Sequence, residues 1–224
     1  MKAATVIFGG TFDPVHYGHL RAASEVCEKL SADDFRLLPA GQPPHRDHTG
    51  AEAYHRLAML ELALAPYSDL TVDEREVRRD GPSYMVETLA TIRQEAGSRP
   101  IILCLGQDAA NQLSGWHRWR ELLDLAHLLV MKRPRSRPKY AGEVAELLRE
   151  RRVRRPGQLM EAASGRVCYL GVTQLAISST DIRRQLAEGR DPRFLLPSTV
   201  LAYIRKHGLY RRSGAATGKP GKTG

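Results

Sequence analysis

Short apolar runs alternate with amphipathic segments along most of this 224-residue chain. The strand-like runs lie near residues 3–8, 34–38, 69–74, 101–105, 127–131 and 166–171. Helical patterns separate most of them, from near Gly18 to Leu30 and then over about 51–65, 83–96, 117–125 and 141–150. Strands that alternate with helices favour a parallel sheet covered on both faces. Right-handed crossovers then predict an α/β fold with a doubly wound, Rossmann-like sheet.

The length suits one α/β domain, which we place at residues 1–210. The remaining residues, 211–224, carry four positive charges and no acidic side chain. We expect this basic tail to be disordered, because its composition gives it little apolar surface to bury. Residues 132–160 are rich in Pro and Arg and weakly patterned, so this segment is the best candidate for an excursion from the sheet.

A glycine-rich turn, GGTFDPVHYGH, follows the first predicted strand at residues 9–19. Its glycines allow backbone N–H groups to approach anionic oxygens, and the next helix directs its positive dipole end to the same place. His16 and His19 are three residues apart and would share one face of a helical turn. Both can carry charge near neutral pH, so the turn predicts a phosphate site. Ligands of doubly wound sheets bind at this end of the strands.

A second turn, ISSTDIR at residues 177–183, combines hydroxyl side chains with a helix start. Ser178 with Asp181 resembles a capping box in which Asp replaces the usual Glu or Gln. A capped helix N-terminus with extra hydroxyls is also an anion site, so both interpretations can hold together. Arg183 lies one turn into the helix, where its guanidinium can fork onto phosphate oxygens.

These two turns resemble the signatures of the nucleotidyltransferases related to class I aminoacyl-tRNA synthetases. Four further stretches, in the same order, resemble bacterial nicotinate mononucleotide adenylyltransferases: residues 39–46, 81–84, 106–108 and 116–119. The resemblance spans about residues 4–208. It implies that the adenylyl group of ATP is transferred to nicotinate mononucleotide, giving nicotinate adenine dinucleotide and pyrophosphate in NAD biosynthesis.

The resemblance also implies roles for individual residues. It makes His16, His19 and Arg183 catalytic, with His19 stabilising charge that develops on the α-phosphate of ATP. The residues that it assigns to ATP binding are Gly9, Gly10, Thr11, Phe12, Asp108, Ser178, Ser179 and Thr180. For Asp108 a contact with ribose hydroxyls is favoured over a purely local role as a loop carboxylate or helix cap.

Acceptor binding is assigned by the same resemblance to Arg46, Tyr84, Met85 and Trp116. The family often has lysine where Arg46 stands, and Arg46 keeps the positive charge. It often has threonine where Met85 stands, but the backbone N–H groups of Tyr84 and Met85 suffice to receive a carboxylate. Trp116 follows a Ser-Gly loop and can stack on a pyridine ring, whereas Trp119 is expected in the core.

We expect Mg²⁺ to enter with ATP, because no carboxylate cage for a divalent cation is visible in the sequence. His45, His48 and His55 match no common zinc spacing, and no cysteine is nearby. The sequence also lacks the G-x-x-x-x-G-K-[ST] pattern of a P-loop and the G-x-S-x-G pattern of a nucleophile elbow.

The formal charge of +9 is concentrated in two places. Residues 132–155 have a net charge of +7 and the tail has +4, so the rest of the chain is close to neutral. A solvated basic surface is favoured over nucleic-acid binding, because only Tyr140 is interleaved with this basic segment. A phosphopantetheine adenylyltransferase is a second alternative, although such chains are generally shorter and lack the stretches at 81–84 and 116–119.

No apolar run approaches the ~20 residues that span a bilayer, and no secretory signal is apparent. Cys27, Cys104 and Cys168 are odd in number, far apart and in apolar segments, which favours buried thiols in a reducing cytosol. We therefore expect a cytoplasmic protein with no membrane partner, and the resemblance implies an enzyme with ATP and nicotinate mononucleotide as its ligands. The sequence leaves its oligomeric state open, and a homo-oligomer is compatible with it.

Overall fold

The computed structural model describes residues 4–43, 49–132 and 138–211. In this part of the chain seven parallel strands form one sheet, in the order β3-β2-β1-β4-β5-β7-β6. The strands are β1 (Thr5–Gly10), β2 (Asp34–Pro39), β3 (Thr71–Val72), β4 (Ile101–Gly106), β5 (His127–Lys132), β6 (Arg152–Val153) and β7 (Val167–Gly171). This arrangement confirms the predicted α/β class with a doubly wound, Rossmann-like sheet.

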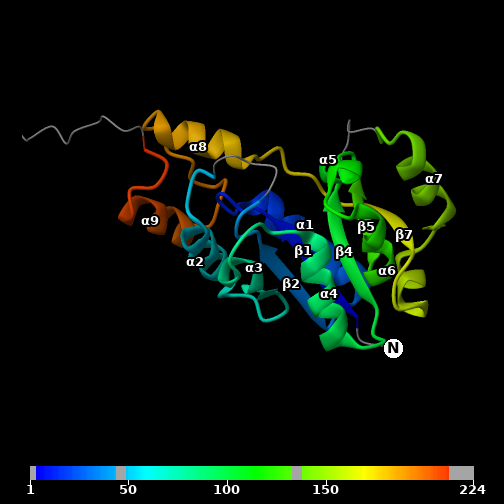
Figure 1. Cartoon of the computed structure of the whole chain (residues 1–224). Coiled ribbons are helices and arrows are strands. Elements are labelled where there is room, and N and C mark those ends of the chain that lie inside the picture. Colours follow the sequence, from blue (N-terminus) through cyan, green and yellow to red (C-terminus); the bar gives the residue numbers. More distant parts are fainter. Residues whose placement is uncertain (1–3, 44–48, 133–137, 212–224) are drawn as a thin grey trace, which may run out of the picture.

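Helices cover both faces of the sheet (Figure 1). The α-helices are α1 (Tyr17–Leu30), α2 (Ala53–Leu64), α3 (Arg75–Arg78), α4 (Met85–Ala96), α5 (Gln107–Ala110), α6 (Leu122–Leu125), α7 (Gly142–Glu150), α8 (Ser179–Ala187) and α9 (Ser198–Lys206). Short 3₁₀ helices are η1 (Leu113–Gly115), η2 (Trp119–Glu121) and η3 (Pro156–Glu161). Figure 1 shows α8 and α9 on the same side of the molecule as α2, whereas α7 lies on the opposite side.

Alternate residues of the central strands supply two hydrophobic cores. Val6 and Phe8 of β1 join the core that includes side chains of α1, α2, α8 and α9. Ile7, between them in sequence, joins the core that includes side chains of α4, α6 and α7. Burial on both faces explains why these strands are continuous apolar runs rather than alternating apolar and polar residues.

Two predicted elements are much shorter than the sequence pattern suggests. The strand expected at 69–74 is reduced to β3, because the Asp73 carboxylate accepts a hydrogen bond from the Arg75 N–H (3.2 Å) and the chain turns into α3. The helix expected at 117–125 is instead η2 followed by the single turn of α6, since β5 begins at His127.

The segment 132–160 contributes to the sheet rather than only leaving it. Its described part contains α7 and the edge strand β6, which pairs with β7 through Arg152 and Val153. Helix α9, which is not among the predicted helices, buries Val200, Leu201 and Ile204. Beyond Arg211, the predicted basic tail lies outside the described residues.

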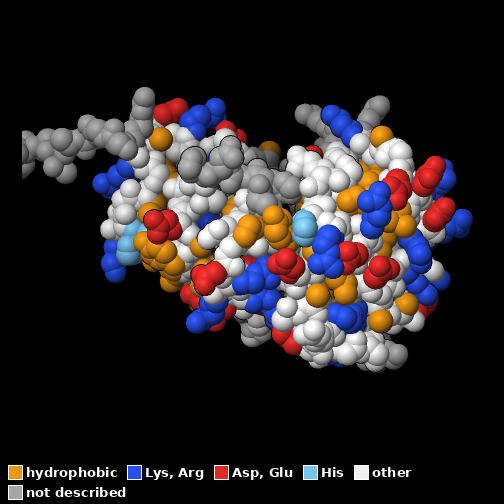
Figure 2. All heavy atoms as spheres, in the orientation of Figure 1, with side chains coloured by type: hydrophobic (Ala, Val, Ile, Leu, Met, Phe, Trp, Pro, Cys, Tyr) orange, Lys and Arg blue, Asp and Glu red, His pale blue; other side chains and the backbone are white. Residues whose placement is uncertain are grey.

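The predicted buried thiols are confirmed, because Cys27, Cys104 and Cys168 are all buried and free. No helix in the described ranges is both long and apolar enough to cross a membrane. The described arginines between residues 149 and 155 are exposed, and Figure 2 shows acidic and basic side chains interspersed over the visible face.

The order of the strands reverses between β1 and β4. From β1 the sheet extends through β2 to β3 on one side, and through β4 and β5 to β7 and β6 on the other. The carboxyl ends of β1 and β4 therefore flank the crevice where ligands of doubly wound sheets bind. The glycine-rich turn leaves β1 at this point.

Candidate active site

The first turn brings its two histidines together at the start of α1. His16 precedes the helix in an extended conformation and is buried, while His19 lies in the first helical turn. Their rings stack with centroids 3.7 Å apart and planes inclined by 21°. The rings of Phe12 and His19 meet edge to face, with centroids 5.1 Å apart. The prediction that both histidines share one face is confirmed.

Position 18 has no room for a side chain, because the His16 ring occupies the adjacent space. A Cβ atom on Gly18 would lie 2.9 Å from both Cε1 and Nδ1 of His16, which is closer than carbon atoms pack. Phe12 takes a left-handed backbone conformation (φ 49°) and buries its ring, so the chain can turn sharply between β1 and α1. The turn is thus built around the histidine pair.

The second turn lies directly against the first, although the contacting residues Pro14 and Ser179 are 165 positions apart in sequence. Ser179 Oγ donates a hydrogen bond to the Pro14 carbonyl (3.0 Å), and Arg183 Nη1 donates to the Asp13 carbonyl (2.6 Å). The predicted cap is also present, because Ser178 Oγ accepts from the Asp181 N–H (3.1 Å). The N-termini of α1 and α8 therefore contribute to one site.

A buried guanidinium that sequence reasoning missed supports the turn from behind. Arg56 of α2 is fully buried and donates to the carbonyls of Thr11 (2.9 Å), Ala40 (2.5 Å) and Gly41 (2.7 Å). These bonds fix the loop after β1 and the loop after β2 relative to each other. In the sequence Arg56 looks like one more charge on an amphipathic helix, so only its burial identifies this role.

A cavity of about 220 Å³ opens between the ends of β1 and β4. Three of the residues predicted to bind the acceptor, Tyr84, Met85 and Trp116, line it together. The other lining residues are Gly9, Gly10, Thr11, Leu38, Ala40, Pro43, Glu76, Ser83, Leu105, Gly106, Ala109 and His117. The segments 81–84 and 116–119, which contribute Tyr84 and Trp116, therefore meet at this cavity.

The aromatic wall of the cavity comes from two elements. The ring of Tyr84, at the start of α4, lies against the ring of His117 with centroids 4.3 Å apart. Trp116 follows η1 and is partly exposed, whereas Trp119 is buried in the core, as predicted. Aromatic side chains in the wall of a cavity suit a heteroaromatic ring.

The start of α4 lies at Met85, with Tyr84 as its capping residue. The Tyr84 N–H donates to the Pro82 carbonyl (3.1 Å), so this donor is engaged inside the loop. The Met85 N–H belongs to the first helical turn, where backbone N–H groups have no acceptor within the helix. Of the two predicted donors, Met85 is the better prepared for an anion.

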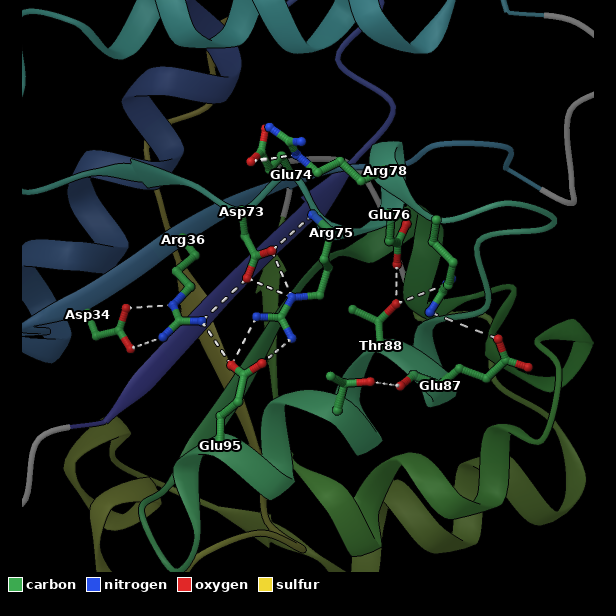
Figure 3. A network of polar contacts seen from close by, with 12 residues as sticks. Asp34, Arg36, Asp73, Glu74, Arg75, Glu76, Arg78, Glu87, Thr88 and Glu95 are labelled. Atoms are coloured by element: carbon green, nitrogen blue, oxygen red, sulfur yellow. Dashed lines mark hydrogen bonds and ion pairs between the residues drawn. The ribbon is translucent and has the colours of Figure 1, made fainter.

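Hydroxyl groups fix the two loops beside the cavity. Ser83 Oγ accepts from the N–H groups of Gly41 (2.9 Å) and Gln42 (3.1 Å). Thr88 donates to the buried Glu76 carboxylate (2.7 Å), as Figure 3 shows. Burial raises the pKa of Glu76 above its ordinary value, although the Thr88 hydroxyl opposes that shift. This acid is placed to influence the charge of the cavity wall.

The remaining predicted site residues differ in their location and exposure. Asp108 is exposed in the first turn of α5, between the cavity-lining residues Gly106 and Ala109. Thr180 is exposed at the start of α8, where its Oγ1 lies 3.4 Å from Arg183 Nη2. Arg46 lies outside the described residues.

Comparisons with known proteins agree with this geometry. The sequence model of the cytidylyltransferase-like family matches residues 7–185. A protein of Methylococcus capsulatus named probable nicotinate-nucleotide adenylyltransferase is 50% identical over 207 residues, which cover 92% of this chain and 99% of that protein. A protein of the same name from Pseudomonas fluorescens is 48% identical over 206 residues, covering 92% and 96%.

A solved structure of Plasmodium falciparum nicotinic acid mononucleotide adenylyltransferase complexed with NaAD has the same fold. It superposes with a TM-score of 0.71 at 15% identity and covers 93% of this chain and 97% of that one. Matches over most of the sequence, at up to half of its positions, establish the relationship that the two turns indicate. The chain belongs to the cytidylyltransferase-like family and, within it, to the nicotinate-nucleotide adenylyltransferases.

Proposed function

We propose that this chain transfers the adenylyl group of ATP to nicotinate mononucleotide, forming nicotinate adenine dinucleotide and pyrophosphate for NAD biosynthesis. The observation that carries the proposal is the junction of the two turns beside the aromatic cavity. The helix N-termini of α1 and α8 meet through Ser179 and Arg183. The cavity with Tyr84, Met85 and Trp116 adjoins the same glycine-rich turn.

The triphosphate of ATP would occupy the junction of the two turns. Gly9, Gly10, Thr11 and Phe12 present backbone and hydroxyl groups there, and two helix dipoles favour negative charge. Ser178, Ser179 and Thr180 add hydroxyls on the α8 side, while Asp108 would accept from the ribose. Such sites work by positioning and by stabilising charge, with little covalent chemistry for the protein to perform.

Charge stabilisation during the transfer falls to three side chains. His19 would donate to the α-phosphate oxygen where negative charge grows, and His16, stacked on it, would hold the neighbouring phosphates. Arg183 would reach the phosphates from α8 with its forked guanidinium. The acceptor phosphate then attacks the α-phosphorus as pyrophosphate leaves on the opposite side.

The acceptor would place its pyridine ring in the cavity between the strands. Trp116 would stack on the ring, and the N-terminus of α4 would receive its carboxylate chiefly at the Met85 N–H, with Tyr84 lining the cavity beside it. Arg46 would contact the phosphate of the mononucleotide. Binding energy from the ring thereby helps to align the attacking phosphate.

Enzymes of this family generally use a divalent metal with ATP, and we propose Mg²⁺. In the described ranges no group of three His, Cys, Asp or Glu side chains converges to hold an ion. We therefore propose that the cation arrives bound to the triphosphate and keeps several of its water ligands. When bound, the cation would neutralise charge on the phosphate oxygens.

Pyrophosphate release provides the test. The purified protein is incubated with ATP, Mg²⁺ and one acceptor at a time: nicotinate mononucleotide, nicotinamide mononucleotide or phosphopantetheine. We expect nicotinate mononucleotide to give the highest kcat/KM. A preference for phosphopantetheine would replace the proposal by the alternative adenylyltransferase, and no release with any acceptor would refute it.

The stereochemistry at phosphorus tests the single displacement. ATP made chiral at the α-phosphate should give a product of inverted configuration, because no enzyme nucleophile intervenes. Retention would require a covalent adenylyl-enzyme and would contradict direct transfer.

A further inference from the structure

Asp13 is a buried carboxylate at the centre of the first turn, with 1% of its surface exposed. Its Oδ2 accepts from the Gly50 N–H (2.6 Å), and its Oδ1 accepts from the Ala51 N–H (3.1 Å). The Tyr210 hydroxyl donates to the same Oδ1 (2.7 Å). One side chain thus joins the turn after β1, the segment before α2 and the end of the described chain.

Asp13 also contacts Arg183 in two ways. Its backbone carbonyl accepts from Arg183 Nη1 at 2.6 Å, and its Oδ2 lies 3.6 Å from the same nitrogen. A guanidinium that is held at one nitrogen can turn its other N–H groups in only a few directions. The orientation of Arg183 therefore depends on where Asp13 lies.

The stem of Arg183 is confined by a close approach to Gly50 and Tyr210. A Cβ atom on Gly50 would lie 2.6 Å from Cδ of Arg183 and 2.9 Å from Cε1 of the Tyr210 ring. The tyrosine ring and the arginine stem thus flank the same glycine. Any movement of the ring would open space for Arg183 to change its rotamer.

Tyr210 follows helix α9, which ends at Lys206, and is held in place there. The Leu209 N–H donates to the Ile204 carbonyl (3.0 Å), and the backbone of Tyr210 takes a left-handed conformation (φ 63°). Burial and the neighbouring Asp13 raise the pKa of the Tyr210 hydroxyl, so it stays protonated and donates. Its proton can point to the carboxylate at any pH near neutrality.

We propose that Tyr210, acting through Asp13, is a positioning residue that sets the direction of Arg183 toward the phosphates of ATP. This inference rests on the proposed function, in which Arg183 binds those phosphates. It makes the end of the domain, 197 residues from Asp13, part of the nucleotide site. Tyr210 touches no reacting atom in this scheme, so its effect should be confined to nucleotide binding and transfer.

The test compares two single-atom deletions. Tyr210→Phe removes the hydroxyl that contacts Asp13, whereas Tyr203→Phe removes a hydroxyl on α9 that contacts His55 (2.9 Å) rather than a residue of either turn. For Tyr210→Phe we expect the Kd of a non-hydrolysable ATP analogue, measured by calorimetry, to rise about fivefold, the scale of one hydrogen bond. Tyr203→Phe should stay within about twofold of the wild type.

A double-mutant cycle with Arg183→Lys shows whether the effect passes through Arg183. Lysine cannot hold both contacts of the guanidinium, so Tyr210→Phe should weaken nucleotide binding by less than about twofold in that background. Equal losses in both backgrounds, or wild-type binding by Tyr210→Phe, would overturn the inference. The melting temperature of each variant is measured as well, so that binding is compared at a temperature at which all variants are folded.

The two proposals fail in different experiments. Nucleotide binding is measured without an acceptor, so it tests the positioning role even if pyrophosphate release shows another acceptor. If the wild type makes nicotinate adenine dinucleotide but Tyr210→Phe also binds and turns over as the wild type does, the proposed function stands and the positioning role is wrong. A rise in the KM for ATP without a rise in the KM for the acceptor is the expected kinetic pattern.

Discussion

At the scale of single residues, Gly18 shows how tightly the histidine pair is built. In Gly18→Ala the new Cβ must displace the His16 ring, which lies 2.9 Å from its position. We expect kcat to fall about tenfold or more, because small misplacements of charge-stabilising groups are costly. Far-UV circular dichroism should be unchanged, since alanine favours helices. Gly157→Ala is the matched control, because no atom lies within 4 Å of its Cβ position and it is remote from the site.

Substitution of His19 should lower kcat more than substitution of Gly18. His19→Ala removes one donor to the developing charge, which typically costs a hundredfold or more, so we expect roughly that loss in kcat. The fold should persist, because His19 is only partly buried on the first turn of α1. Steady-state kinetics beside a melting curve separate these effects, and near-normal turnover in a folded variant would remove His19 from the mechanism.

At the scale of elements, the N-terminus of α4 should select the charged acceptor. The Met85 N–H and the helix dipole favour the carboxylate of nicotinate mononucleotide over the neutral amide of its nicotinamide analogue. A mispaired amide would cost about 1–3 kcal/mol for each unsatisfied group, and the charge-assisted bonds to the carboxylate widen the gap. A difference of ~1.4–4 kcal/mol gives a preference of roughly ten- to a thousandfold. The readout is kcat/KM for both mononucleotides at fixed ATP. Equal values would show that α4 does not read the carboxylate.

Trp116→Ala provides the companion measurement for the cavity. The tryptophan should stack equally on both pyridine rings, so its loss should raise both KM values by a similar factor and leave the preference intact. Base–aromatic stacking is worth about 1–3 kcal/mol, which corresponds to roughly five- to a hundredfold. A change confined to one acceptor would mean that Trp116, rather than α4, discriminates between them.

At the scale of the whole molecule, Glu25 links helix α1 to the segment that follows strand β7. Its carboxylate accepts from the Thr173 N–H (2.9 Å), after β7, and pairs with Arg21 (2.7 Å) on α1. These bonds lower its pKa to about 2, with the Thr173 contacts as the largest cause. Because the folded pKa lies below the unfolded one, this stabilisation is complete above about pH 4.5 and is lost as the pH falls toward 2.

Urea unfolding at several pH values measures that contribution. Glu25→Gln should be less stable than the wild type at pH 7, and the difference should shrink between about pH 4.5 and 2. Glu28→Gln, three residues after Glu25 on the same helix, is an exposed control that should change little. A constant difference across the whole pH range would mean that the carboxylate charge of Glu25 is not the stabilising feature.

Much of this architecture follows from local sequence, and the exceptions have a physical pattern. The central strands are visible because both of their faces are buried, as at Val6 and Ile7. The edge strand β6 has two residues, too few to produce a periodic signal. At the site, the turns and Trp116 carry recognisable local chemistry. Arg56 and Tyr210 act through contacts with distant backbone and carboxylate groups, which no local pattern encodes.

The meeting of the two turns also has a consequence for the order in which a ribosome makes this protein. Asp13 leaves the exit tunnel early, but its partner Arg183 is made 170 residues later. Domains fold largely as units during synthesis, so a nascent chain that ends before α8 carries an incomplete nucleotide site. Phosphate-binding capacity should therefore arise abruptly near the end of translation, and truncated products should not compete with the finished enzyme for ATP.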